Sequence, residues 1–486
     1  MEYIRRFWGI WVGIAVFLVM LFLPSPEGLS PEAWRTAAVT SLMAIWWISE
    51  AIPIYATALV PIILFPFLGV TDIGGATTPY ANPIIYLFLG GFFLAIAMER
   101  WQLHRRIALS IVLRSGVKST SIIFGFMMAS ALLSMFVSNT ATAIMMLPIA
   151  ISILDLTKDA TEYERRNFQI VLILAIAYGC NIGGMGTLIG SPPNALLAGF
   201  FMENYGFEVS FLDWMIIGVP VVIISLPLVF LLLTRLIYPI HLPELKGGKA
   251  FIQSELTAMG RVTAQETMVG MVFFITASLW IIRPFISEWI PGLSDAGIAI
   301  GSAVVLFLLP SLDDSQRSLL SWNDTKRMPW GVLILFGGGL SMASAISGSG
   351  LAQWIGQNLT VLGQWPTVVL IIGVVSLMIF LTELTSNTAS TAAFLPIIAS
   401  LALGLGENPL LLAMAVTLAA SCAFMLPVAT PPNAIVYGTE RISIPQMAKA
   451  GLWVNVLFIG LITLVAYVLV MWWFGIELGV VPDWAI

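Results

Sequence analysis

Two short tracts of small polar residues lie inside long apolar stretches of the chain and have the chemistry to bind ions. The first tract is Ser138–Thr142, followed by Pro148, and the second is Ser386–Ser390, followed by Pro396. The spacing from tract to proline is the same in both. Hydroxyl, amide and carbonyl oxygens suit a hard cation such as sodium. Hydroxyl and amide donors, together with helix N-termini, suit a carboxylate anion.

Each tract is followed by a proline-rich break, at Gly190–Asn194 and at Ala429–Asn433. Proline removes a backbone donor and clashes with the preceding helical turn. In lipid the carbonyl groups that are freed in this way must find another partner. We therefore expect the helix to unwind at each break and its carbonyl oxygens to point at a ligand. In each half of the chain, one tract and one break can together form one oxygen-lined cation site and one half of an anion site.

A structural role is the alternative interpretation of these residues. Small polar side chains often hold membrane helices together, and that role would suffice for a single Ser-Asn-Thr tract. Two copies, each paired with a broken helix, favour binding. Two acidic residues are weaker candidates. Glu50 lies at a helix end where water is close, and Glu383, three residues before the second tract, could affect cation binding electrostatically.

The elements that position these residues must lie mostly inside a bilayer. The 486 residues are 59% hydrophobic and only 10% charged, with a mean hydropathy of +0.97. This composition excludes a water-soluble protein and a disordered one. The net charge of −5 without a basic block argues against a nucleic-acid partner. Cys180 and Cys422 form no disulfide framework.

Eleven apolar segments are expected to cross the membrane, and two further stretches are too long for one crossing of about 20 residues. The long stretches, 120–155 and 366–402, are each either a hairpin that enters and leaves on one side or a pair of crossings. The first segment lacks a small-residue cleavage site, so it is interpreted as a retained helix. The eleven segments are 7–23, 35–50, 54–70, 83–99, 167–200, 212–238, 266–284, 296–310, 330–347, 410–438 and 450–474.

The basic residues predict the orientation of these segments. With the N-terminus in the cytoplasm, every lysine and arginine except Arg35 and Arg283 falls on the cytoplasmic side. The basic segments 100–118 and 158–166 flank the first long stretch, so that stretch returns to the side on which it begins. The C-terminus is then outside.

The motifs repeat in opposite orientations, which is typical of a secondary transporter. We expect an N-terminal helix at 1–33 and a first inverted repeat at 34–240, with a hairpin facing the cytoplasm. A cytoplasmic linker at 241–265 leads to a second repeat at 266–486, with a hairpin facing outside. The amphipathic segments 100–117 and 350–364 are interpreted as interfacial helices.

The two Ser-Asn-Thr tracts, together with Gly-Ser-Pro-Pro-Asn and Ala-Thr-Pro-Pro-Asn, resemble the divalent anion/sodium symporter family from Trp34 to the end of the chain. The resemblance implies a homodimer of eleven-helix protomers, each with a scaffold domain and an elevator-type transport domain. Helices 1–4 and 7–9 would form the scaffold. Both hairpins and helices 5, 6, 10 and 11 would form the transport domain.

The resemblance also implies which residues bind the cargo, by motif matching. The first sodium site would be formed by Ser134, Ser138, Asn139 and Gly190. The second sodium site would be formed by Thr382, Thr385, Asn387 and Ala429, with Thr385 contributing a backbone carbonyl. The substrate carboxylates would meet Asn139, Thr140, Ser386, Asn387, Thr388, Thr430 and Pro431.

The function expected on this basis is inward symport of a small C4-dicarboxylate such as succinate, malate or fumarate, driven by sodium in the cell (inner) membrane. Neither the tracts nor the breaks contain lysine or arginine. A divalent anion in a low-dielectric site needs compensating charge, which bound sodium supplies. No organic cofactor is expected; the partners are sodium, the dicarboxylate, the bilayer and a second copy of the chain.

Other functions remain alternatives at this stage. A tricarboxylate or sulfate symporter, or a sodium-independent dicarboxylate exchanger, would use a similar architecture. A membrane enzyme would need an acid–base or metal cluster, but His104 and His241 are the only histidines and lie far apart. A channel is disfavoured by inverted repeats with deep hairpins, and saturable flux coupled to sodium would separate the two.

Overall fold

The computed structural model describes residues 2–157, 161–242, 244–245, 247–312, 318–358 and 365–485. Lys158, Lys246 and Arg317 lie outside the described residues, as does the end of the predicted interfacial helix 350–364. Within the described residues the regular structure is helical, apart from one isolated β-bridge between Lys118 and Glu244. The predicted all-α class is therefore confirmed.

In the first half, the described residues form twelve α-helices, several of them short. They are α1 (Glu2–Phe22), α2 (Pro31–Ser49), α3 (Ile54–Thr57), α4 (Val60–Phe67), α5 (Ile73–Thr77), α6 (Pro83–Arg100), α7 (Leu103–Ser115), α8 (Ser119–Ser134), α9 (Asn139–Leu154), α10 (Glu162–Gly184), α11 (Pro192–Tyr205) and α12 (Phe211–Leu231).

The second half follows a similar order. Its helices are α13 (Gly248–Ala258), α14 (Ala264–Ile286), α15 (Asp295–Leu308), α16 (Trp330–Gly348), α17 (Leu351–Asn358), α18 (Thr367–Thr382), α19 (Asn387–Gly404), α20 (Pro409–Ala420), α21 (Pro431–Tyr437), α22 (Ile444–Val465) and α23 (Met471–Phe474).

Eight helical segments of the described chain are long and apolar enough to cross a membrane. Two of them are the second arms of the long apolar stretches, and shorter apolar helices such as α8, α15, α18 and α20 accompany them. The eight are Ile73–Arg100, Asn139–Thr157, Glu162–Gly184, Phe211–Ile237, Ala264–Ile286, Trp330–Gly348, Asn387–Gly404 and Ile444–Phe474.

Both long apolar stretches fold as a helix, a tight turn and a second helix. In the first stretch α8 ends at Ser134 and α9 begins at Asn139. In the second, α18 ends at Thr382 and α19 begins at Asn387. The Ser138 hydroxyl accepts a hydrogen bond from Ala141 N at 3.2 Å and so caps α9. The polar tracts thus lie where each hairpin turns into its second arm, as the capping residue and the first turn of α9 and α19.

The proline-rich breaks differ in position from the prediction. The unwound residues after α10 are 185–191, and those after α20 are 421–430, whereas Pro192 and Pro431 each begin the next helix. Proline has a fixed φ and no N–H group, which suits the first helical position, where that N–H would have no partner in the helix. The Pro-Pro-Asn sequence therefore restarts the helix, and the unwinding precedes it.

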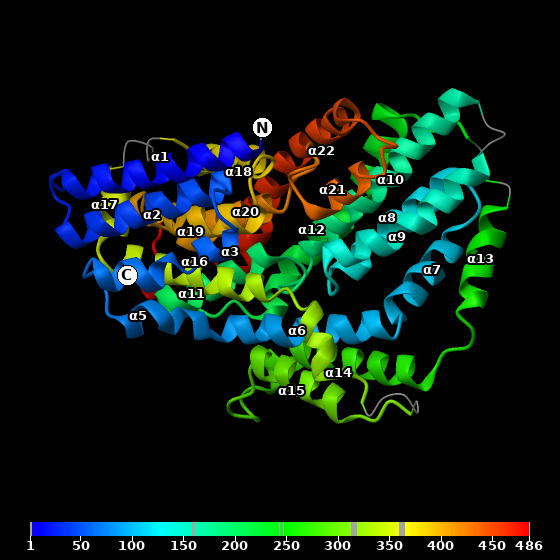
Figure 1. The fold of residues 1–486 in the computed structure, drawn as a ribbon, viewed down its shortest axis with the longest axis horizontal. Helices are drawn as coiled ribbons and strands as arrows, with labels where there is room; N and C mark the ends of the chain where they lie inside the picture. Colours follow the sequence, from blue (N-terminus) through cyan, green and yellow to red (C-terminus); the bar gives the residue numbers. More distant parts are fainter. Residues whose placement is uncertain are drawn as a thin grey trace.

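Helix α10 packs against both arms of the first hairpin, α8 and α9, and against α21 and α12. Every residue of α10 from Ile170 to Gly184 is buried. In Figure 1, α8, α9 and α10 lie on the same side of the molecule, while α14 and α15 pack against α6 along the opposite edge. A Cβ atom placed on Gly183 of α10 would lie 2.1 Å from Ala131 O, so only glycine lets α10 approach α8 this closely.

Candidate functional site

Both polar tracts and both breaks line one cavity of about 510 Å³. Residues far apart in the sequence therefore meet, as the repeat pattern predicted. The predicted residues in the cavity wall are Ser138, Asn139, Thr140, Gly190, Ser386, Asn387, Thr388, Ala429, Thr430 and Pro431.

Three predicted cation ligands, Ser134, Thr382 and Thr385, lie behind the tracts and do not line the cavity. All three are buried. The Thr382 hydroxyl donates to Asn387 Oδ1 at 2.5 Å. Thr385 Oγ1 lies 2.5 Å from Ser390 Oγ, so its hydroxyl is already engaged.

Asparagine side chains hold each broken helix in the same way. Asn194 Nδ2 donates to Gly184 O at 2.9 Å and to Thr187 O at 2.7 Å. In the second half, Asn433 Nδ2 donates to the carbonyls of residues 423 and 426 at 3.0 and 3.1 Å. Each asparagine thus contacts the carbonyls ten and seven residues before it. Carbonyls freed by the unwinding are therefore partly satisfied by the asparagine of the Pro-Pro-Asn motif itself.

Oxygen atoms converge where the first tract meets the first break. A Cβ atom on Gly184 would lie 3.0 Å from Asn139 Nδ2 and 3.1 Å from Gly190 O. Asn139 Oδ1 is buried and has no hydrogen-bond partner among the described residues. Buried oxygens without partners are costly, and a bound hard cation would satisfy them. Asn139 and Gly190, two of the four ligands that the family resemblance implied for a first sodium site, therefore lie close together.

The positive potential at the cavity wall comes from helix ends and not from basic side chains. Among the described residues that line it there is no lysine or arginine. The helices α9 and α19 begin at the cavity wall, with Asn139 and Asn387 as their first residues. Their N-terminal amide groups carry positive partial charge, which favours an anion. Groups of three or more His, Cys, Asp or Glu that could hold a metal are absent from the described chain.

The Glu383 carboxylate holds the second break in place through hydrogen bonds, a role that the sequence did not indicate. Its side chain is 3% exposed and accepts hydrogen bonds from the backbone N–H groups of residues 424, 425 and 426 at 2.7 to 3.0 Å. Asn455 Nδ2 donates to the same carboxylate at 2.8 Å. The carboxylate therefore fixes the second break to the end of the hairpin arm α18. From the sequence, Glu383 was only an acidic residue in an apolar segment. Its hydrogen-bond partners could not be predicted, because they are backbone amides of a loop.

Asn181 was missed by the sequence analysis. It lines the cavity from α10, is 2% exposed and donates to Thr430 Oγ1 and Ala423 O, both at 3.2 Å. It therefore joins a helix of the first half to the break of the second. A polar amide in an otherwise apolar helix was the available signal. Glu50, by contrast, is exposed at the end of α2 and lines the cavity rim.

Comparison with known proteins gives a family profile and close relatives over nearly the whole chain. The profile described as the sodium:sulfate symporter transmembrane region matches residues 4–478. The sodium-dependent dicarboxylate transporter SdcS of Staphylococcus saprophyticus is 44% identical over 481 residues, which cover 96% of this chain and 92% of the relative. The protein of the same name from Staphylococcus aureus strain USA300 is 42% identical, with 97% and 92% covered.

Two solved structures share the fold at low sequence identity. The YdaH transporter of Alcanivorax borkumensis matches with a TM-score of 0.58 and 16% identity, covering 88% of this chain and 97% of that one. MtrF of Neisseria gonorrhoeae matches with a TM-score of 0.60 and 11% identity, covering 94% of each chain. At these identities the likeness establishes the fold alone: an all-helical protein that crosses the membrane several times.

Proposed function

The chain belongs to the sodium:sulfate symporter family, and from this premise we propose that it carries small dicarboxylates into the cell together with sodium ions. The family consists of transporters, so the prediction that the chain is not an enzyme is confirmed. Relatives at 42–44% identity are sodium-dependent dicarboxylate transporters. The observation that carries the proposal is the single cavity lined by both tracts and both breaks, without a basic side chain among its described residues.

The substrate site of the proposal lies at the meeting point of the two halves. Each tract offers hydroxyl and amide donors, and α9 and α19 add their N-termini, so each half can meet one carboxylate of a C4-dicarboxylate. Thr430 is held towards the site by Asn181. The proposed substrate ligands are Asn139, Thr140, Ser386, Asn387, Thr388, Thr430 and Pro431.

Sodium ions supply the charge that the site lacks. The proposed ligands of the first ion are Ser134, Ser138, Asn139 and Gly190, and those of the second are Thr382, Thr385, Asn387 and Ala429. Because Asn139 and Asn387 belong to both the cation and the substrate sites, binding of one cargo favours binding of the other. This mutual dependence would make transport a symport.

The proposed architecture is two inverted repeats with eleven crossings and two re-entrant hairpins. The four hairpin arms have 16 to 18 residues, or about 24–27 Å of helix, which is slightly less than the roughly 30 Å hydrocarbon core. The first arms, α8 and α18, are shorter apolar helices, which supports hairpins that turn within the bilayer, whereas the second arms are long enough to cross. The scaffold and elevator division, the homodimer and the cytoplasmic N-terminus are proposed from the family resemblance and the charge pattern.

Uptake by the purified protein in proteoliposomes tests the function. Radiolabelled succinate should accumulate when sodium is high outside, saturate with concentration, and be competed by malate and fumarate. Equal uptake in potassium or choline buffer would overturn symport and favour a sodium-independent exchanger. Stronger competition by sulfate or a tricarboxylate than by malate would reassign the substrate. Flux that does not saturate would favour a channel.

A further inference from the structure

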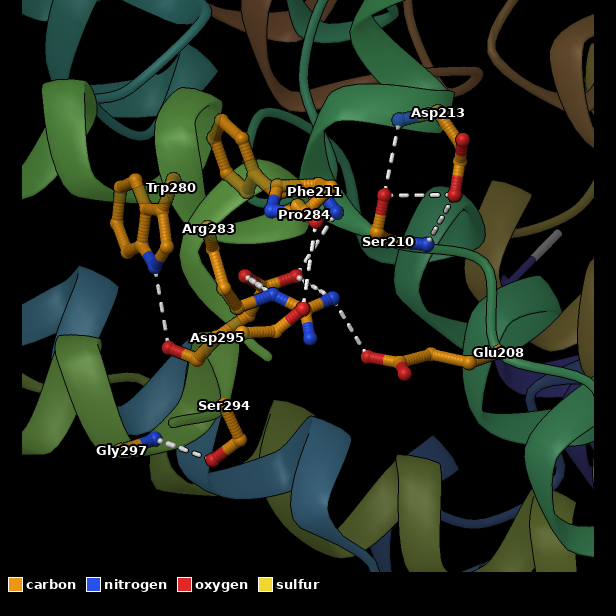
Figure 2. A network of polar contacts seen from close by, with 11 residues as sticks. Glu208, Ser210, Phe211, Asp213, Trp280, Arg283, Pro284, Ser294, Asp295 and Gly297 are labelled. Carbon is orange, nitrogen blue, oxygen red and sulfur yellow. Dashed lines mark hydrogen bonds and ion pairs between the residues drawn. The ribbon is translucent and has the colours of Figure 1, made fainter. Parts of the chain in front are cut away.

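Arg283 is buried near the end of α14 that the charge pattern places outside, and it is one of the two basic residues that depart from the cytoplasmic distribution. Its side chain is only 8% exposed. Arg283 Nε lies 2.6 Å from Asp295 Oδ1, and Arg283 Nη2 lies 2.6 Å from Glu208 Oε1. Figure 2 shows the guanidinium between the two carboxylates. A buried cation needs such partners, because removing one leaves an uncompensated charge.

The two carboxylates come from different parts of the fold. Asp295 is the first residue of α15, which packs with α14 and α6. Glu208 lies in the connection from α11 to α12, next to the cavity-lining break. The start of α12 reinforces the contact, since Phe211 N donates to Asp295 Oδ2 at 2.8 Å. The Phe211 ring also stacks on Trp280 of α14, with centroids 4.4 Å apart.

The connection that carries Glu208 is held in a fixed shape. Ser210 and Asp213 form a reciprocal cap at the start of α12, with Ser210 N to Asp213 Oδ2 at 2.9 Å and Asp213 N to Ser210 Oγ at 3.1 Å (Figure 2). Trp280 Nε1 donates to Asp295 O at 3.0 Å, which fixes the other side. Each of the two surfaces is therefore held in shape by its own hydrogen bonds.

In the predicted topology, the ion pairs of Arg283 lie at the outer end of the molecule and the rim of the main cavity lies at the cytoplasmic end. That rim includes the exposed residues Glu50, Tyr55 and Pro329, at segment ends predicted to be cytoplasmic. Arg283 lies at a segment end predicted to be outside. In this conformation the site is therefore open on the inner side and the ion pairs close the outer side.

We propose that Arg283, Asp295 and Glu208 form an outer latch between the scaffold and the moving transport domain, which holds the inward-open state and opens in each cycle. The inference rests on the proposed function, which places α14 and α15 in the scaffold and α11 and α12 in the transport domain. It adds a set of residues, outside the cargo site, that sets the balance between the two states.

The burial of the three side chains suits a reversible contact. Glu208 is 57% exposed, whereas Asp295 is 9% exposed and lies on the same body as Arg283. When the transport domain moves, Glu208 can pass into water while Arg283 keeps Asp295 as its partner, so neither buried charge is left alone. A second cavity of about 300 Å³, lined by residues of both bodies such as Ile84 and Met202, lies beside the pair. This second cavity leaves the contact between the scaffold and the transport domain less than fully packed.

Substitution of Glu208 tests the latch through the accessibility of the main cavity. Val428 is 72% exposed and lines that cavity, so a Val428→Cys parent can be labelled with a membrane-impermeant maleimide from either side of a vesicle. Both native cysteines are buried and give little background. Adding Glu208→Gln should raise the ratio of outside to inside labelling by roughly fivefold or more, the lower end of typical coupling between states. Glu208→Asp should restore part of the parent ratio.

The matched control is Glu255→Gln, which removes the acid of the half-exposed Arg105–Glu255 pair between α7 and α13 and should leave the ratio unchanged. A ratio that Glu208→Gln leaves unchanged, or that Glu255→Gln changes equally, would overturn the latch. The labelling does not depend on uptake. A shifted ratio, combined with no sodium-driven succinate uptake by the protein that keeps Val428, would therefore support the latch and count against the proposed cargo.

Discussion

Asparagine occupies the positions where the helices of this chain begin and break at the cavity. Asn139 and Asn387 are the first residues of α9 and α19, and Asn194 and Asn433 span the two breaks. An amide is suited to these places because it offers both donors and an acceptor. It is also neutral, so its burial costs less than that of a charge.

Asn139→Ala and Asn387→Ala should each abolish transport while the protein stays folded. Each change removes a donor and an acceptor at a polar site, at a cost of about 1–3 kcal/mol, or roughly 5- to 150-fold in binding. Because each residue is assigned to both cargoes, the apparent affinities for sodium and succinate should fall together. Uptake measured against both concentrations checks this.

The control for these variants is Asn358→Ala. Asn358 is exposed on α17 and donates to Trp354 O at 2.9 Å, away from the cavity, so its loss should be nearly silent. Wild-type sodium and succinate dependence in the Asn139 and Asn387 variants would show that the site assignment is wrong, even with the fold intact.

Glu383→Gln should weaken sodium binding more than a general loss of stability explains. The substitution places an amide nitrogen where one carboxylate oxygen accepts backbone N–H groups of residues 424–426. Losing these bonds costs about 1–3 kcal/mol and loosens the break that carries Ala429 and Thr430. We expect a higher sodium concentration for half-maximal uptake and a lower melting temperature.

Glu407→Gln separates the two effects. Glu407 is another buried carboxylate, which accepts from Thr367 Oγ1 at 2.6 Å and from Gly479 N at 3.0 Å at the base of the second hairpin. It should lower the melting temperature without changing the sodium dependence. If the two variants shift sodium dependence equally, Glu383 has no specific link to the cation site.

At the scale of the helices, the sequence predicted the kinds of element better than their ends. Stretches 120–155 and 366–402 were too long for one crossing, and their polar tracts lie where each hairpin turns into its second arm. The unwound residues were placed too late, because the proline pair was interpreted as the interruption. The proline pair instead forms the first turn of the next helix. The position of the unwound residues depends on where the preceding helix stops packing.

Gly183→Ala should destabilise the protein by separating α10 from the hairpin arm α8. The added Cβ would meet Ala131 O at 2.1 Å and Ala131 Cα at 2.6 Å, and backbone atoms cannot rotate away. Overpacking of this kind costs typically about 1–3 kcal/mol. Since α8 is the hairpin arm that leads into the first tract, succinate uptake should fall together with the melting temperature.

Gly460→Ala in α22 is the matched change, because nothing lies within 4 Å of its added Cβ. It should leave the melting temperature unchanged or slightly higher, as alanine favours helix. Equal losses in both variants would mean that helix propensity, and not the close approach of α8 and α10, explains the effect of the first.

At the scale of the whole molecule, the motif pairs correctly indicated which segments would meet, but not the contacts between them. The two tracts share one cavity because repeated motifs occupy matching positions in the two halves. The bond from Asn181 to Thr430 joins residues 249 apart, and no local pattern specifies such a pair. Arg283 likewise looked like a simple exception to the charge rule, until its two carboxylate partners were located.

The inverted arrangement of the halves predicts opposite exposure of the two hairpin bases. The basic segment 158–166 follows the first hairpin, whereas residues 403–409 follow the second and contain no lysine or arginine. The positive-inside rule therefore places the first base in the cytoplasm and the second outside. In sealed right-side-out vesicles, an impermeant maleimide should modify Leu405→Cys and miss Tyr163→Cys, although Tyr163 is 59% exposed. Opening the vesicles with detergent should make both react, which controls for reactivity. Labelling of both from the same side would contradict the inverted topology, and with it the outer position of the Arg283 cluster.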